Sequence, residues 1–156
     1  MTAEKQKPKP IVSRPANHME VEGELCKLFY QRFGDKALPI IEAVFREWGI
    51  VIGEGLRAKV PAGDLKAAVE TYLRPTMARE PKPEIIEATN EKVELKVFTC
   101  PYRLNGAGRP LCEAMTAMDK AAIGTLVGAE IEIKPFKTLA APGDECCHGV
   151  ITRKTP

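Results

Sequence analysis

The stretches Glu84–Thr89 (EIIEAT) and Lys92–Thr99 (KVELKVFT) decide the fold class, because the hydrophobic pattern changes there from helical to strand spacing. In the second stretch apolar and charged residues alternate, with Val93, Leu95 and Val97 set between Lys92, Glu94 and Lys96. A period of two predicts a strand with one buried and one wet face, as is typical of antiparallel sheets. The pair Asn90-Glu91 joins the two predicted strands.

Three helices are expected before these strands. Apolar residues recur at helical spacing in three segments: His18–Phe33, about Pro39 to Ala58, and Leu65–Leu73. Asp64 is a suitable N-cap for the third helix. Gly49, Gly53 and Gly55 weaken the second half of the second helix, so close packing or a kink is expected there.

One long helix and further strands are expected after Thr99. The helix runs from Arg109 or Pro110 to Val127, and Gly128 ends it. A strand follows at Ala129–Ile133, with a continuation at Phe136–Leu139, and the last strand covers Cys146–Thr152. Helices followed by hairpin-linked strands predict an α+β fold, with N-terminal helices and one long helix packed on an antiparallel sheet of four to five strands.

Length and composition indicate one domain. The chain has 156 residues, and residues 18–156 are expected to form a single α+β domain after a proline-rich arm at residues 1–17, disordered or loosely docked. The net charge is only +2 and no basic stripe is interleaved with aromatics, which argues against nucleic acid as a partner. No apolar run is long enough for a membrane span, and no signal-peptide pattern follows the basic N-terminus, so a cytoplasmic location is expected.

The candidate functional residues concentrate in the last third of the chain. All but one of the five cysteines lie there, as Cys100, Cys112, Cys146 and Cys147, followed directly by His148. Cys112 is expected in the first turn of the long helix, where the helix dipole favours a thiolate. If Cys146 and His148 share one strand face and Cys112 approaches it, a metal set of Cys100, Cys112, Cys146 and His148 is geometrically feasible, with zinc or iron as the metals to consider. The alternative is that these cysteines are inert core residues.

Asp119 is the second candidate centre. It lies seven residues after Cys112 in the predicted helix, so both side chains fall on nearly one face. A carboxylate there would position water or bind a cationic group of a substrate, whereas the alternative is a solvated Asp119 beside Lys120. Arg103 and Arg109 flank the loop after Cys100 and are candidates for binding a substrate carboxylate, although surface arginines are common.

The C-terminal third also carries a family resemblance. Its segments are Thr99–Tyr102, Leu111–Glu113, Met118-Asp119, Phe136–Leu139, Gly143–Cys146 and Gly149–Ile151. Together they resemble the signature of the L-2-amino-thiazoline-4-carboxylic acid hydrolase-like family: a Cys-Pro pair, a Cys opening a helix, an acidic residue, a GD..C turn and a final strand. This resemblance implies a hydrolase for C–N (non-peptide) or C–S bonds of a small heterocyclic or amide-like organic acid, with Cys112, Asp119 and Cys146 as catalytic residues.

The same segment is similar, more distantly, to the vinyl-4-reductase domain of aromatic-sensing regulators. Cys112 and Cys146 match the first and last cysteines of that domain's zinc ligands. Pro135 and Thr138 stand where its intervening Glu and Cys ligands would be. The implied alternative function is a non-catalytic small-molecule or zinc-binding sensor, acting through a partner or as a homodimer. A redox or metal-handling accessory, suggested by Cys146-Cys147-His148, is a third hypothesis.

Overall fold

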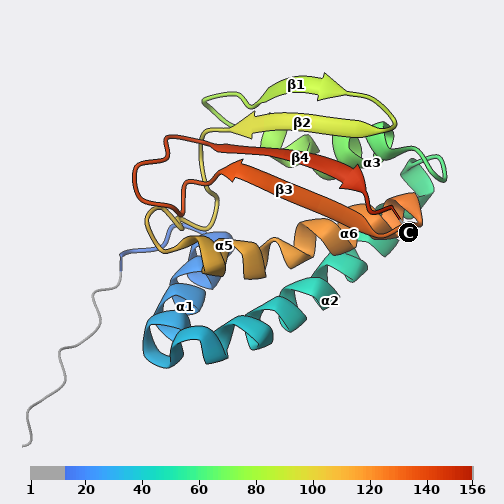
Figure 1. Cartoon of the computed structure of the whole chain (residues 1–156). Coiled ribbons are helices and arrows are strands. Elements are labelled where there is room, and N and C mark those ends of the chain that lie inside the picture. Colours follow the sequence, from blue (N-terminus) through green and yellow to red (C-terminus); the bar gives the residue numbers. More distant parts are fainter. Residues whose placement is uncertain (1–12, 156) are drawn as a thin grey trace, which may run out of the picture.

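The sheet confirms the predicted α+β class. The computed structural model describes residues 13–155. Its four strands are β1 (Glu84–Ala88), β2 (Lys92–Val97), β3 (Ile131–Lys137) and β4 (Cys147–Arg153). They form one antiparallel sheet in the order β1-β2-β4-β3 (Figure 1). The C-terminal strand β4 therefore lies between β2 and β3.

The helices lie in layers on one side of this sheet. They are α1 (His18–Phe33), α2 (Leu38–Leu56), α3 (Leu65–Tyr72), α4 (Arg74–Met77), α5 (Arg109–Met115) and α6 (Ala117–Val127). Figure 1 shows α5 and α6 under the sheet, with α2 and α1 beneath them and α3 near the β1 end. As expected, the Asp64 side chain caps α3 by accepting a hydrogen bond of 2.9 Å from the Ala67 N–H.

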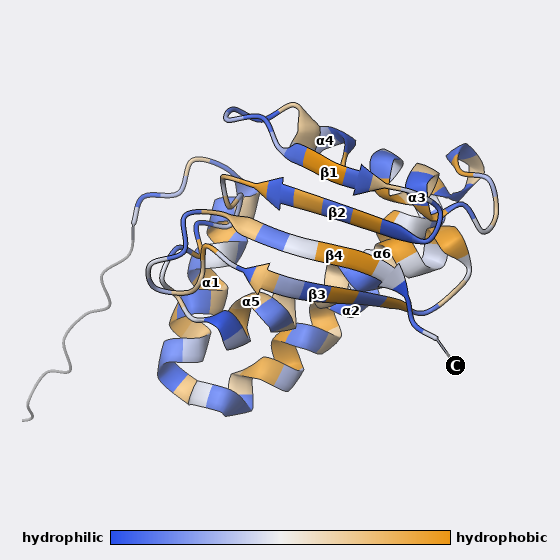
Figure 2. Ribbon diagram, turned by 45° about the horizontal axis from the view of Figure 1, so that its top comes forward, coloured by the Kyte–Doolittle hydropathy of each residue, from blue (hydrophilic) through white to orange (hydrophobic). Residues whose placement is uncertain are grey.

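Burial follows the alternation in β2. Val93 and Leu95 are buried and belong to a core cluster with Leu65, Ile123 and Ile151, which joins the sheet to α3 and α6. Figure 2 shows the corresponding alternation of hydrophobic and hydrophilic residues along the strands. A second cluster fills the space between α1, α2 and α5, so the helical layers have a core of their own.

Glycines let α2 lie directly on α6. A Cβ added at Gly49 would stand 2.3 Å from the Met118 carbonyl oxygen, and one at Gly53 would stand 2.6 Å from the Thr125 Cβ. The close packing predicted for this glycine-rich segment is therefore confirmed at these two positions. Gly55 faces open space and has no such role.

The predicted helix 110–127 is interrupted at Thr116, which separates α5 from α6. The Thr116 Oγ1 donates a hydrogen bond of 2.7 Å to the Cys112 carbonyl oxygen. Such bonding back to the preceding turn bends helices. The backbone N–H of Thr116 also donates to the Cys112 carbonyl oxygen at 2.9 Å, so α6 follows α5 directly.

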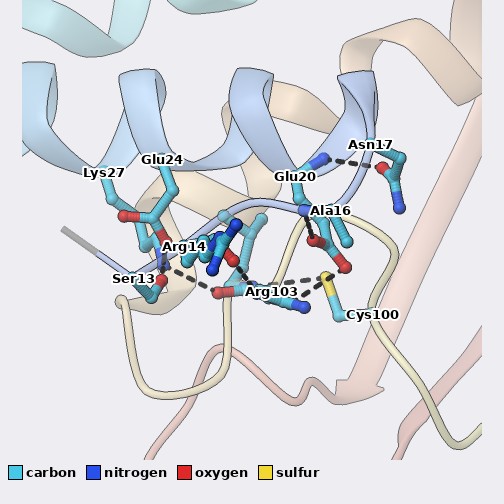
Figure 3. A network of polar contacts seen from close by, with 10 residues as sticks. Ser13, Arg14, Ala16, Asn17, Glu20, Glu24, Lys27, Cys100 and Arg103 are labelled. Carbon is cyan, nitrogen blue, oxygen red and sulfur yellow. Dashed lines mark hydrogen bonds and ion pairs between the residues drawn. The ribbon is translucent and has the colours of Figure 1, made fainter.

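A polar network ties the start of the described chain to α1 and to the loop before α5 (Figure 3). Arg103 forms an ion pair with Glu20 at 2.9 Å and donates a hydrogen bond of 3.0 Å to the Arg14 carbonyl oxygen. Ser13 Oγ donates to Glu24 Oε1 at 2.5 Å. Residues 13–17, the described part of the predicted arm, thus dock on α1, and residues 1–12 lie outside the described residues.

Within residues 13–155, no helix is both long enough and apolar enough to cross a bilayer.

Candidate functional site

A large cavity lies between the sheet and the helical layer. Its volume is about 1210 Å³. The sheet contributes Leu95, Val97, Ile133 and Ile151, the α5–α6 segment contributes Met115, Thr116, Asp119 and Ile123, and α2 contributes Trp48, Ile52 and Leu56. Residues 71–76 of α3 and α4 form a further wall. Most of this lining is apolar, as in pockets that bind small organic molecules.

The register of β4 decides which of the adjacent C-terminal side chains faces the cavity. Cys147 pairs with Val97 and Gly149 pairs with Leu95, so both lie on the face that carries the core. Residue 148 also borders the cavity, but the His148 side chain lies on the opposite face, because neighbours in a strand alternate. Its Nε2 is 2.8 Å from Glu94 Oε1, and its ring packs edge-on against Phe136.

Three thiols line the cavity: those of Cys100, Cys112 and Cys147. Thr138 Oγ1 donates to Cys112 Sγ at 3.3 Å, and the backbone N–H of Leu139 donates to Cys147 Sγ at 3.4 Å. Burial raises the pKa of the Cys112 and Cys147 thiols, and the hydrogen bonds to their sulfurs oppose that rise. Both thiols are therefore neutral at neutral pH, and a neutral thiol is a poor nucleophile.

Asp119 is the principal polar group in the cavity wall. The Tyr72 hydroxyl donates a hydrogen bond of 2.5 Å to Asp119 Oδ1, which links α3 to α6. Burial raises the pKa of Asp119 to about 6, and the hydrogen bond from Tyr72 partly offsets this effect. The expectation that Asp119 and Cys112 line one cavity is confirmed, because both belong to its wall.

The other predicted site residues are dispersed. Arg109 lines the cavity, and its guanidinium donates a hydrogen bond of 3.3 Å to the Phe136 carbonyl oxygen. Arg103 is exposed and engaged with Glu20 and Arg14 in the network of Figure 3, away from the cavity lining. Cys146 is buried just before β4 and is not part of the cavity wall.

These positions correct the predicted grouping of Cys146 and His148 opposite Cys112. Strand β4 begins at Cys147, so this cysteine takes the place that the prediction gave to Cys146. In the part of the chain that the structure describes, no three His, Cys, Asp or Glu side chains are arranged to hold a metal ion. The predicted zinc or iron set of Cys100, Cys112, Cys146 and His148 therefore does not fit this geometry.

Two cavity residues had no role in the sequence-based prediction. Tyr72 meets Asp119 from 47 positions away in the sequence, and no local pattern signals that pairing. Trp48, the single tryptophan, lies in the segment predicted as the second helix, and it borders the cavity with about half of its surface exposed. An exposed tryptophan within an apolar stripe is a signal that a binding surface is near.

Comparison with known proteins identifies folds of the same kind. No protein-family model matches the chain, and no curated protein matches it in sequence. A trafficking protein particle complex subunit 3 from Naegleria fowleri, solved covalently bound to palmitic acid, matches with a TM-score of 0.59 and 11% identity over 88% of this chain and 93% of that chain. The phenol-responsive sensory domain of the transcription activator PoxR, solved with phenol, matches with a TM-score of 0.59 and 13% identity over 90% of this chain and 76% of that chain. At these identities the similarity establishes the fold alone.

Proposed function

We propose that this protein is a small-molecule-binding module that takes an apolar ligand into the cavity between the sheet and α5–α6. The observation that carries the proposal is a volume of about 1210 Å³ with mostly apolar walls and one half-buried, hydrogen-bonded polar pair, Tyr72 and Asp119. Apolar walls supply the affinity for such a ligand, and a few placed polar groups fix its orientation. The phenol bound by one structural neighbour and the palmitic acid bound by the other support a ligand with an apolar body.

The single tryptophan provides the test. Trp48 lies at the cavity, so its fluorescence should change when phenol or palmitate is titrated into the full chain. Val97→Phe narrows the cavity from the sheet side and should weaken any such binding. Val150→Phe, on the opposite face of β4, is the matched control and should bind as the wild type does. Equal binding by both variants, with circular dichroism showing that both fold, would place the ligand elsewhere.

Hydrolysis of a heterocyclic organic acid remains a prediction from family resemblance. The cavity brings Cys112 and Asp119 into one wall, as that prediction requires. However, the side-chain hydrogen bond to the Cys112 sulfur comes from Thr138, which is not a base, and burial raises the pKa of the thiol. Activation of a cysteine nucleophile needs an adjacent base or a lowered pKa, so we place ligand binding ahead of catalysis.

Homodimerisation is also retained as a proposal. Large apolar side chains are exposed on the two outermost helices: Val21, Leu25 and Phe33 on α1, and Ile40, Val44, Trp48 and Val51 on α2. Figure 2 shows that much of the α2 ribbon is coloured hydrophobic. Extended apolar patches of this kind mark interaction surfaces. Sedimentation tests the proposal: the wild type should be a dimer and Val44→Glu a monomer. Ile86→Glu makes a comparable apolar-to-acidic change on β1, away from these helices, and should leave the dimer intact.

A further inference from the structure

The Asp119 carboxylate lacks a cationic partner within the described part of the chain. Its polar contact is the hydrogen bond that Tyr72 donates to Oδ1, and no ion pair involves it. Asp119 is half-buried, and burial raises its pKa. Carboxylates that are largely removed from water are ordinarily paired with a cation or a metal, because removing an isolated charge from water is costly. An unpaired carboxylate in the wall of a ligand-sized cavity indicates that the compensating charge comes from outside the chain.

The groups around Asp119 do not supply that charge. The titratable groups that interact with it are acids from three different elements: Tyr72 of α3, Tyr102 of the loop after Cys100, and Cys112 of α5. On the sheet side the cavity-facing residues of β2 are apolar, and Cys147 of β4 carries a neutral thiol. Among residues 13–155, the titratable groups that interact with Asp119 are thus the hydroxyls of Tyr72 and Tyr102 and the thiol of Cys112.

The charged side chains at the edge of the cavity do not form ion pairs with Asp119 within the described residues. The lining includes the bases Lys59, Arg74, Arg79, Arg109, Lys120, Lys137 and His148 and, besides Asp119, the acids Glu22 and Glu113. Lys59, Arg74, Lys120 and Lys137 are exposed, so water and salt screen their charges. The half-buried Arg109 donates its hydrogen bond to the Phe136 carbonyl oxygen, and the His148 ring lies against Glu94. The half-buried Arg79 acts on Tyr102. Burial and the Tyr72 hydrogen bond together account for the pKa of Asp119, and none of these bases contributes to it.

We propose that the ligand carries a protonated primary amine on an apolar body, and that its ammonium pairs with Asp119 while the body fills the apolar cavity. This inference rests on the proposed function and specifies its ligand class. Tyr72 would hold Oδ1 and leave Oδ2 to accept a hydrogen bond from the ammonium. Hydrogen bonds between charged groups are stronger than neutral ones, so the amine should be preferred over an alcohol of the same shape.

Acid should weaken this binding. The pKa of Asp119 is raised to about 6 in the protein, so acidification below that value protonates the carboxyl before any amine loses its charge. A cation cannot pair with the neutral carboxyl group. Affinity for the amine should therefore fall about tenfold between pH 7.5 and pH 5, whereas affinity for a neutral ligand should change much less.

The experiment compares probes of one shape on the full chain. Isothermal titration with 2-phenylethylamine, 2-phenylethanol and 3-phenylpropanoate at pH 7.5 should rank the amine first, by about tenfold or more over the alcohol. Asp119→Asn keeps the shape and the acceptor for Tyr72 but removes the charge, so it should abolish the preference for the amine and leave alcohol binding within about threefold. Asp35→Asn, at an exposed position between α1 and α2, is the control and should change neither the preference for the amine nor the affinity for the alcohol.

The titrations can overturn the inference in two ways. Alcohol binding that equals or exceeds amine binding in the wild type, or an amine preference that survives Asp119→Asn, overturns the inference and leaves the proposed function standing. Failure of all the probes to bind overturns the inference and counts against the proposed function as well. Tyr72→Phe gives a second readout that leaves the charge in place: without this hydrogen bond the pKa of Asp119 rises further, so the pH at which amine binding is lost should rise.

Discussion

The hydroxyl of Tyr72 donates a hydrogen bond of 2.5 Å to Asp119 Oδ1 across the interior of the protein. This contact joins the end of α3 to the first turn of α6 and places a carboxylate in the wall of an apolar cavity. A polar pair that is only partly satisfied in a low-dielectric environment is costly for folding.

Replacing Asp119 should stabilise the protein at neutral pH. The pKa of Asp119 rises from 3.8 to about 6 on folding, so the folded state holds the proton more tightly and loses stability as the pH rises through this interval. Asp119→Asn removes that loss and should raise the free energy of unfolding by about 1–3 kcal/mol at pH 7.5, with little gain near pH 4. Urea denaturation of the wild type and of Asp119→Asn at both pH values measures this change in the free energy of unfolding. A variant that is less stable than the wild type at pH 7.5 would show that the charge contributes to the fold.

The close contact of α2 with α6 should tolerate no added methyl group at Gly49. A Cβ there would stand 2.3 Å from the Met118 carbonyl oxygen, so Gly49→Ala should force the helices apart and cost about 1–3 kcal/mol. Gly55→Ala lies in the same helix and meets open space. It should stabilise the protein by about 0.5–1 kcal/mol through helix propensity alone. Thermal unfolding of both variants separates the effect of helix packing from that of helix propensity. Equal changes in unfolding temperature for Gly49→Ala and Gly55→Ala would contradict the close contact between α2 and α6.

The cavity thiols should react slowly with alkylating agents. Burial raises the pKa of both Cys112 and Cys147, which leaves little thiolate at pH 7.5. Mass spectrometry after timed exposure to iodoacetamide should show slower labelling of these residues than of a small free thiol. A ligand in the cavity should slow Cys112 and Cys147 further and leave Cys26, which is outside the cavity wall, unchanged. Rapid labelling of Cys112 at neutral pH would instead support an activated nucleophile.

Local sequence patterns predicted the parts of the fold that local physics determines. The alternation from Lys92 to Val97 predicted a strand because one face of β2 is buried and the other is wet. Asp64 was predicted as a helix cap because its side chain meets a backbone N–H only three residues away. The close contacts at Gly49 and Gly53 were also expected, since glycine weakens a helix and persists where a neighbour leaves no room.

The candidate site was only partly predictable because long-range pairing decides its geometry. Pairing of Val97 with Cys147 turns that cysteine toward the cavity and sends His148 to the other face. A shift of one residue would reverse both, and a single sequence does not reveal the register. Likewise, Tyr72 and Asp119 meet only because α3 and α6 pack together. The break at Thr116 was missed because its hydroxyl bonds to the preceding turn rather than to solvent.

The measurement that tests the central claim most directly is a methyl NMR titration with 2-phenylethanol on protein labelled at the isoleucine δ1 methyl groups. Ile52, Ile123, Ile133 and Ile151 line the cavity, whereas Ile40, Ile85 and Ile86 are exposed outside it. Binding in the cavity should give saturable shifts of the first group and leave the signals of the second unchanged. Shifts confined to Ile40, Ile85 and Ile86, or no shifts at all, would contradict a ligand-binding cavity between the sheet and α5–α6.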